Sequence, residues 1–285
     1  MKRLGVIGGT GIYDLKGFKK KEELEVVTPF GRPSAKYILS EFAGKEVVFL
    51  PRHGLNHEIN PSLINYQANI YGMKKLNVSK ILSVSACGSL KEELKPLDLV
   101  IPDQFIDRTF MRKNSFFEKG VVAHIALAHP ICNKAAKTLQ EAVKSAGLQS
   151  RFGGVYLNME GPQFSTKAES NLYRSWGADI IGMTNFSEAR LAREAEICYA
   201  SLSAVTDFDC WHPDFGEVSI EVIIKYLQKN SLNSKKVIKE FVALEDPNES
   251  CGCHQALKNA IVTKPEAIPN PAKEKLNILI KKYIK

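Results

Sequence analysis

Short apolar runs that end in small or polar residues recur along this chain, and they restrict the folds open to it. The most informative run extends from Ile197 to Val205 and leads into Asp207-Phe208-Asp209. Runs of this length are typical of buried β-strands. Similar runs are Leu4–Ile7, Val47–Leu50, Ile81–Val84, Val155–Met159 and Ile180–Met183. Because open α/β sheets bind ligands beyond the carboxyl ends of their strands, the residues after these runs are expected to meet at one rim.

Segments with helical signals separate these runs. Thr166 and Glu169 form a capping box that predicts the start of a helix. The other predicted helices run from Asn60-Pro61 to Leu76, from Cys132 to Ala146, from a Ser187 cap through 188–195, and onward from Ser219. Strands that alternate with helices predict an α/β fold. Residues 1–245 are expected to form one domain, followed by a peripheral tail at 246–285 with an amphipathic segment at 276–280.

The composition is ordinary for a globular protein, with 285 residues of which 44% are hydrophobic and 25% charged. No stretch approaches the roughly 20 apolar residues of a membrane span, and no signal-peptide pattern precedes the first strand. A cytoplasmic enzyme without a membrane partner is therefore expected. The formal net charge of +8 could indicate nucleic acid. However, the lysines are scattered and do not sit among aromatic residues, which favours a solvated basic surface and no nucleic-acid partner.

The six cysteines include a Cys251-Gly252-Cys253 motif in the tail. No pair of Cys-x-x-Cys units is present, so a structural metal site is not expected. Cys132 and Cys198 are expected to act as small core residues. The motif in the tail leaves two alternatives open, which are free thiols and a strained disulfide between Cys251 and Cys253.

Several of the rim residues are suited to binding an oxyanion. Gly8-Gly9-Thr10-Gly11 follows a strand and resembles a turn whose backbone N–H groups point at phosphate, although it lacks a dinucleotide fingerprint and a Walker lysine. Arg52 and His53 offer a guanidinium fork and an imidazole. Ser85-Ala86 and Thr184 add hydroxyl and amide donors. Each element has a plain alternative, a tight turn or an exposed pair, but together they predict a phosphate site that needs no metal.

Asp207 and Asp209 add acid–base chemistry to the same rim. They are one residue apart, so in an extended chain they point to opposite sides and are not expected to share a metal. A carboxyl group there can hydrogen-bond a heterocycle and carry a proton to a leaving nitrogen. The simpler alternative is an acidic loop or helix cap after a strand. A phosphate site that faces a carboxylate-lined pocket favours phosphorolysis of a nucleoside.

At this point the chain resembles a known family. The stretches that carry the resemblance are Gly5–Tyr13 (GVIGGTGIY), Pro51–Gly54 (PRHG), Asn65–Ile70 (NYQANI), Ser85–Ser89 (SACGS), Pro102–Arg108 (PDQFIDR), Glu160–Ser165 (EGPQFS) and Ala204–Trp211 (AVTDFDCW). Over roughly residues 3–245 they look like the 5′-methylthioadenosine phosphorylases, which are trimeric purine nucleoside phosphorylases. The resemblance implies a single α/β domain with a central mixed β-sheet flanked by helices, the nucleoside phosphorylase fold.

The resemblance also implies a set of site residues. Phosphate, a co-substrate rather than a cofactor, would be held by Thr10, Arg52, His53, Ser85, Ala86 and Thr184. Met183 would lie against the ribose, Phe164 and Ser165 would line the base, and Ile220 and Ile223 would enclose the methylthio group. Asp207 and Asp209 would face the purine, with Asp207 as the catalytic proton donor. Burial would have to raise the pKa of its carboxyl. No metal or other cofactor is implied.

The implied assembly is a homotrimer or a dimer of trimers, in which His124 reaches a neighbour's site. An apolar patch of Phe116-Phe117 and Val121-Val122 is expected beside it. One departure from the family pattern is Asn185-Phe186-Ser187-Glu188, where the family has Thr-Val-Pro-Glu, and this could shift the start of the helix after Thr184.

Two other functions remain open. A 6-oxopurine nucleoside or methylthioinosine phosphorylase would share the fold, but its expected mark is an amide at position 207. A non-catalytic nucleotide-binding or nucleic-acid-binding protein would use the net charge of +8. The presence of both Arg52 and Asp207 argues against it.

Overall fold

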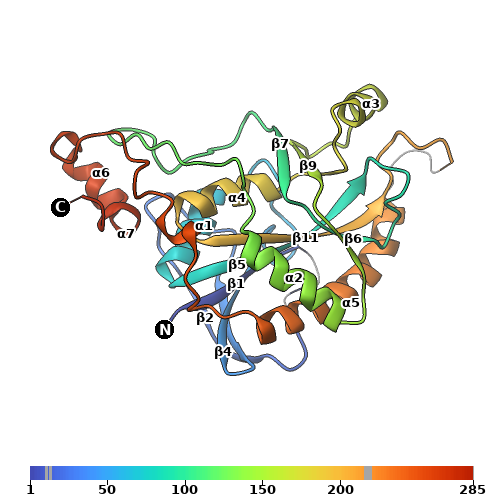
Figure 1. Cartoon of the computed structure of the whole chain (residues 1–285), viewed down its shortest axis with the longest axis horizontal. Helices are drawn as coiled ribbons and strands as arrows, with labels where there is room; N and C mark the ends of the chain where they lie inside the picture. The colour runs from blue at the N-terminus through green and yellow to red at the C-terminus, as the bar shows by residue number, and fades with distance from the viewer. Residues whose placement is uncertain (10–11, 13–14, 215–219, 285) are drawn as a thin grey trace.

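A computed structural model describes residues 1–9, 12, 15–214 and 220–284 as an α/β protein built on one mixed sheet (Figure 1). The strands in the described residues are β1 (Arg3–Gly8), β2 (Lys19–Leu24), β3 (Tyr37–Phe42), β4 (Lys45–Pro51), β5 (Val78–Ser89), β6 (Leu99–Ile101), β7 (Gln104–Arg108), β8 (Ser150–Phe152), β9 (Val155–Met159), β10 (Ile180–Gly182) and β11 (Cys198–Asp207). Every apolar run singled out in the sequence coincides with one of these strands, although Ile197 precedes β11 and Met183 follows β10. The predicted α/β fold with a central mixed sheet is confirmed.

The main path of the sheet has the order β2-β3-β4-β1-β5-β10-β9-β7. β5 is the branch point, because it also pairs in parallel with β11, which in turn pairs with β6. The centre of the sheet consists of four strands that pair in parallel in the order β4, β1, β5 and β11. Almost all of their residues are buried. That pattern is expected of strands covered on both faces.

Helices flank the sheet (Figure 1). They are α1 (Tyr66–Lys75), α2 (Asn133–Ser145), α3 (Lys167–Ser175), α4 (Asn185–Glu194), α5 (Ile220–Leu244), α6 (Asn270–Lys275) and α7 (Asn277–Ile280), with short 3-10 turns η1 (Gly252–Gln255) and η2 (Pro265–Ala267). α2 packs against α5 and both contact β11, whereas α1 packs against α4. The helices thus bury the apolar faces of the central strands.

Two of the predicted helix starts are confirmed and two are wrong. α2 begins after Cys132, and the capping box of Thr166 and Glu169 opens α3. The helix expected from Asn60 begins only at Tyr66, because the Asn60 side chain accepts the backbone N–H groups of Ser62 and Leu63 and holds a turn instead. Ser187 lies inside α4, whose N-cap is Thr184. Ser219 lies outside the described residues.

The segment after residue 245 is not peripheral, contrary to expectation. Leu257, Leu276, Leu279 and Ile280 are buried in the same hydrophobic cluster as the central strands. In Figure 1 this segment, coloured orange to red, crosses from the end of α5 to the far end of the molecule, where α6 and α7 lie. Over the described part of the chain, no helix is long and apolar enough to span a membrane.

Candidate active site

The register of β5 creates an opening in the sheet. On one edge β5 pairs with β1 as far as Val84, where Gly8 is its partner, and with β10 again from Gly88. Among the described residues, none of the strands pairs with the intervening stretch on that edge, and this stretch lines a cavity of about 530 Å³. Volumes of this order hold small-molecule ligands. The opening at the site therefore arises because β1 and β10 pair with different stretches of β5.

Most of the residues proposed from the sequence line this one cavity. From the phosphate set these are Arg52, His53, Ser85, Ala86 and Thr184, and from the nucleoside set Phe164, Met183, Asp207 and Asp209. Ser165 is buried beside them without lining the cavity. His124 is exposed and does not line it. Thr10 and the side chains of Ile220 and Ile223 lie outside what the structure describes. The placement brings the residues together but leaves their roles as predictions.

Arg52 is fixed by a buried ion pair. Its side chain is 2% exposed and its Nε donates to Glu188, which is equally buried. Nη2 donates to Ser83 Oγ at 2.7 Å and Nη1 to the Val84 carbonyl at 3.1 Å. The Glu188 carboxylate also accepts the Tyr199 hydroxyl at 2.9 Å. A guanidinium held by so many partners presents its charge to the cavity from a fixed position, at little further entropic cost.

The imidazole of His53 uses one ring nitrogen to bind a backbone carbonyl, which makes the other nitrogen an acceptor. Its Nδ1 lies 2.9 Å from the Ile59 carbonyl oxygen, and because a carbonyl only accepts, Nδ1 carries the proton. Burial and then the charge of Arg52 lower the pKa of His53 from 6.5 to about 4. The ring is thus neutral near pH 7, with Nε2 as an acceptor. A partner at Nε2 must bring its own proton, as a protonated phosphate oxygen does.

The surroundings of Asp207 favour the protonated form of its carboxyl group. The Thr206 hydroxyl donates to it at 2.7 Å and the Asp209 N–H at 2.8 Å. Burial, reinforced by the charge of Asp209, raises the pKa of Asp207 from 3.8 to about 6. Burial also raises the pKa of Asp209. Two buried carboxyl groups beside one cavity favour a state in which at least one keeps its proton.

The space that Asp207 occupies depends on a glycine. A Cβ added to Gly88 would lie 2.8 Å from Asp207 Oδ1. The Asp209 backbone has a φ of +50°, a left-handed conformation that aspartate tolerates better than most residues. The carboxyl pair is therefore positioned by backbone features of both β5 and the turn after β11.

Three buried oxygen atoms of residues that line the cavity have no hydrogen-bond partner among the described residues. They are Ser85 Oγ, Asp209 Oδ2 and Asn230 Oδ1. Buried polar atoms are normally satisfied, so atoms of this kind in a cavity indicate where a ligand's polar groups bind. Ser85 offers a hydroxyl that can donate or accept, and an ionised Asp209 only accepts.

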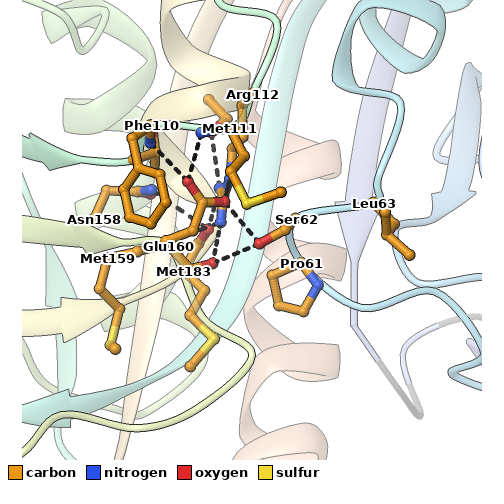
Figure 2. Close-up of polar contacts among 12 residues, drawn as sticks. Pro61, Ser62, Leu63, Phe110, Met111, Arg112, Asn158, Met159, Glu160 and Met183 are labelled. Atoms are coloured by element: carbon orange, nitrogen blue, oxygen red, sulfur yellow. Dashed lines mark hydrogen bonds and ion pairs between the residues drawn. The ribbon is translucent and has the colours of Figure 1, made fainter.

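A second buried ion pair holds the walls of the cavity together (Figure 2). Glu160 accepts from Ser62 Oγ at 2.6 Å, from the N–H groups of Phe110 and Met111 at 2.7 and 3.0 Å, and from Arg112 Nε at 2.9 Å. Burial works against this charge, but the hydrogen bonds prevail and lower the pKa of Glu160 from 4.5 to about 2. The loop before α1, the loop after β7 and the end of β9 thus share one carboxylate.

Arg112 extends the same network to α4 and to the residues that depart from the family pattern. It donates to the Met183 carbonyl and, at 2.9 Å, to the Ser187 hydroxyl. Phe186 packs against Phe105 with the two rings tilted by 32° and their centroids 5.2 Å apart. Asn185 donates to Ser201. Each departing residue therefore has a defined partner, and α4 begins directly after Thr184.

Sequence reasoning missed several residues of this region. Thr206, Cys87, Met159, Asn230 and Ser234 also line the cavity. Arg112, Glu160 and Glu188 support its walls. Glu160 and Glu188 each lie within the motifs noted above, but no pattern in the sequence indicates which arginine each of them meets.

Replacing Glu160 by glutamine is expected to make the free energy of unfolding depend less on pH under acidic conditions. A carboxyl whose folded pKa is depressed stabilises the fold above its unfolded pKa of about 4.5 and loses that contribution as pH falls toward 2. For the shift to about 2, the contribution is at most about 3 kcal/mol. Denaturant unfolding at pH 7, 5 and 3.5 measures it.

Glu46→Gln is the matched control, because Glu46 pairs with Arg3 on the surface, where the two side chains are 22% and 25% exposed. Surface pairs of this kind contribute little. An unchanged slope between pH 5 and 3.5 in Glu160→Gln would contradict the role given to this carboxylate.

Comparison with known proteins places this fold and cavity in a family. Residues 3–243 match the model of the phosphorylase superfamily. The S-methyl-5′-thioadenosine phosphorylase of Koribacter versatilis is 51% identical over 98% of this chain and 96% of its own. That of Geobacter sulfurreducens is 49% identical over 99% of both chains.

Solved structures agree with these relatives. A methylthioadenosine phosphorylase from an antarctic soil metagenomic library has a TM-score of 0.93 at 47% identity and covers 98% of both chains. The Schistosoma mansoni methylthioadenosine phosphorylase in complex with adenine has a TM-score of 0.82 at 35% identity and covers 86% of this chain and 93% of its own. The chain therefore belongs to the phosphorylase superfamily and, within it, to the family of the S-methyl-5′-thioadenosine phosphorylases.

Proposed function

We propose that the chain is a pentosyltransferase that cleaves S-methyl-5′-thioadenosine with phosphate, giving adenine and 5-methylthioribose 1-phosphate. The observation that carries this proposal is a single cavity lined by Asp207 together with Arg52, Ser85 and Thr184. Relatives about 50% identical over nearly the whole chain bear the name of this activity. The cytoplasm is the proposed location.

The reaction follows from the charges around the cavity. As the glycosidic bond lengthens, positive charge develops on the ribose and negative charge on the purine. Phosphate near the Arg52 guanidinium balances the first and attacks the anomeric carbon. Protonated Asp207 donates its proton to the departing purine nitrogen, which neutralises the second. Every step uses residues of this chain and the two substrates.

The carboxyl pair also sets the choice of base. An ionised carboxylate accepts from a 6-amino group, whereas a 6-oxo group would face it with no proton between them. A buried mismatch of this kind costs about 1–3 kcal/mol. The unpartnered Asp209 Oδ2 fits the first case. The 6-oxopurine alternative would require an amide donor at position 207 of this pair.

Adenine release from methylthioadenosine is expected to require phosphate. The purified enzyme is assayed with saturating nucleoside in phosphate-free buffer and again with added phosphate, and arsenate serves as a control for a second oxyanion nucleophile. Release that is undiminished without either anion would mean that water is the nucleophile, and the proposal would fail.

We also propose a homotrimer or a dimer of trimers in which His124 completes a neighbour's site. The sequence predicted an exposed apolar patch beside His124, but two of its residues are buried. Phe116 is 1% exposed and Val121 is 0% exposed. Support comes instead from Phe110, Met111 and Val122, which are 80%, 69% and 48% exposed. Exposed apolar side chains of this size are frequent at interfaces.

Light scattering is expected to give at least a trimer at assay concentration, and His124→Ala is expected to raise KM for the nucleoside while the mass stays unchanged. His129→Ala is the matched control on the same exposed stretch. A fully active monomer would rule the assembly out.

A further inference from the structure

Four cysteine side chains from distant parts of the sequence meet at the end of β11 that is remote from the cavity. The sulfur atoms of Cys132, Cys198, Cys251 and Cys253 all lie within 4.8 Å of one another. Those of Cys132 and Cys251 are 3.6 Å apart. All are free thiols in the structure. β11 begins at Cys198 and ends at Asp207, which separates the cluster from the catalytic carboxyl by about 30 Å at 3.3 Å per residue.

Regular backbone structure holds the four thiols in place. Cys132 is the N-cap of α2, and its N–H donates to the Tyr199 carbonyl of β11 at 2.9 Å. Cys251 is the N-cap of η1, and its carbonyl accepts the His254 N–H at 3.0 Å. Cys132 and Cys198 are 3% and 0% exposed and Cys253 is 9% exposed, while Cys251 is half-buried. The cluster is thus preorganised, and Cys251 provides access from solvent.

The spacing of the sulfur atoms suits a tetrahedral metal. Zn–S bonds of about 2.3 Å place the sulfurs of a four-thiolate site about 3.8 Å apart. The 3.6 Å between the sulfurs of Cys132 and Cys251 is close to that value, and no sulfur pair is more than 4.8 Å apart. A disulfide between Cys251 and Cys253 would satisfy only one pair and would close a small, strained ring. The argument against a metal site from Cys-x-x-Cys spacing does not hold here, because two of the ligands come from the starts of α2 and β11.

The surroundings favour negative charge on sulfur. Cys132 lies at the N-terminus of a helix of 13 residues, where the helix dipole stabilises a thiolate. Lys134 and Arg193 place positive charge near Cys251 and Cys253, respectively. His254 Nε2, which donates to the Ser79 carbonyl at 3.2 Å, lies 3.6 Å from Cys198 Sγ. Polar N–H groups around ligand sulfurs are a usual feature of metal sites.

We propose that Cys132, Cys198, Cys251 and Cys253 bind a single Zn²⁺ ion, which fastens the segment after residue 245 to the sheet. Each thiol releases its proton to solvent as its sulfur binds the metal, so no oxidant takes part. Four thiolates in tetrahedral array select zinc over harder divalent cations. The ion holds α2, β11 and η1 together and contributes to stability rather than to turnover.

Metal analysis of the enzyme purified under reducing conditions tests this. The expected content is about one zinc per chain, and Cys251→Ser/Cys253→Ser is expected to lose it. That variant should melt at a lower temperature than the wild type, and a chelator should lower the wild-type melting temperature toward the variant's. kcat/KM at a temperature where both are folded should be unchanged. Cys210→Ser, outside the cluster, is the control and should keep its zinc.

Cobalt titration of the metal-free wild type gives a readout that does not depend on any variant folding. Tetrahedral thiolate coordination produces charge-transfer and ligand-field bands, which zinc should abolish. Two results overturn the proposal: stoichiometric disulfides among these cysteines in protein purified without reductant, or four thiols that react freely with an alkylating reagent equally fast with and without added zinc. Iron in place of zinc would overturn the choice of metal.

Discussion

Replacing Glu188 by alanine is expected to lower the free energy of unfolding by about 3–5 kcal/mol, because it leaves a buried guanidinium without its counter-ion. Arg52 and Glu188 are each 2% exposed at the side chain, so water cannot take the place of the carboxylate. For a chain of this size the melting temperature should fall by roughly 6–15 °C. Phosphorolysis should fall as well, since Arg52 lines the cavity and Glu188 positions it.

Two variants separate stability from function here. Arg52→Met with Glu188→Leu removes both charges and should recover most of the lost stability without restoring turnover. Glu245→Ala breaks another buried pair, with Lys80, away from the cavity, and should lower the melting temperature while kcat/KM is retained. A change of less than 2 °C or so in Glu188→Ala would contradict the energetic role of the pair.

Asp207→Asn is expected to reduce the kcat/KM for methylthioadenosine by about 10²-fold or more, because the general acid is lost. The same change should improve the relative use of inosine-type nucleosides, since an amide can donate to a 6-oxo group. Steady-state assays with both substrates give the ratio of kcat/KM. An unchanged ratio would show that Asp207 does not read position 6 of the purine.

The same variant should be more stable than the wild type above pH 6. A carboxyl whose folded pKa is raised from 3.8 to about 6 destabilises the fold as pH rises through that range, since the folded state binds the proton more tightly. The cost, at most about 3 kcal/mol, is complete above pH 6 and absent below pH 4. Melting curves at pH 4 and pH 7.5 measure it. Equal melting temperatures of the two proteins at pH 7.5 would show that Asp207 is not destabilising when ionised.

The sequence predicts the strands of this fold better than its helix starts. Strands such as β5 and β11 contain apolar runs and are almost entirely buried, so composition is enough to indicate them. Helix starts depend on single side chains, and the Asn60 oxygen can cap a turn as readily as a helix. For that reason the helix expected from residue 60 begins six positions later, at Tyr66.

The site likewise contains residues whose position the sequence predicts and contacts that it does not predict. Arg52 and Thr184 follow strands, Ser85 lies within β5 and Asp207 ends β11, so the topology of the sheet brings them to one cavity. The pairing of Glu188 with Arg52, and of Glu160 with Arg112, depends on contacts between segments far apart in the sequence. The tautomer of His53 depends on the Ile59 carbonyl. Such contacts leave no periodic signal that a single sequence could display.

The Glu160 network has a consequence for local motion. The side chains of Phe110 and Met111 are largely exposed, yet their amide groups donate to a buried carboxylate at 2.7 and 3.0 Å. Neither amide can meet solvent unless Glu160 is released, and that event also frees Ser62 and Arg112. Segments that look like independent surface loops therefore open as one cooperative unit. A ligand that holds any one of them closed slows the opening of all the others.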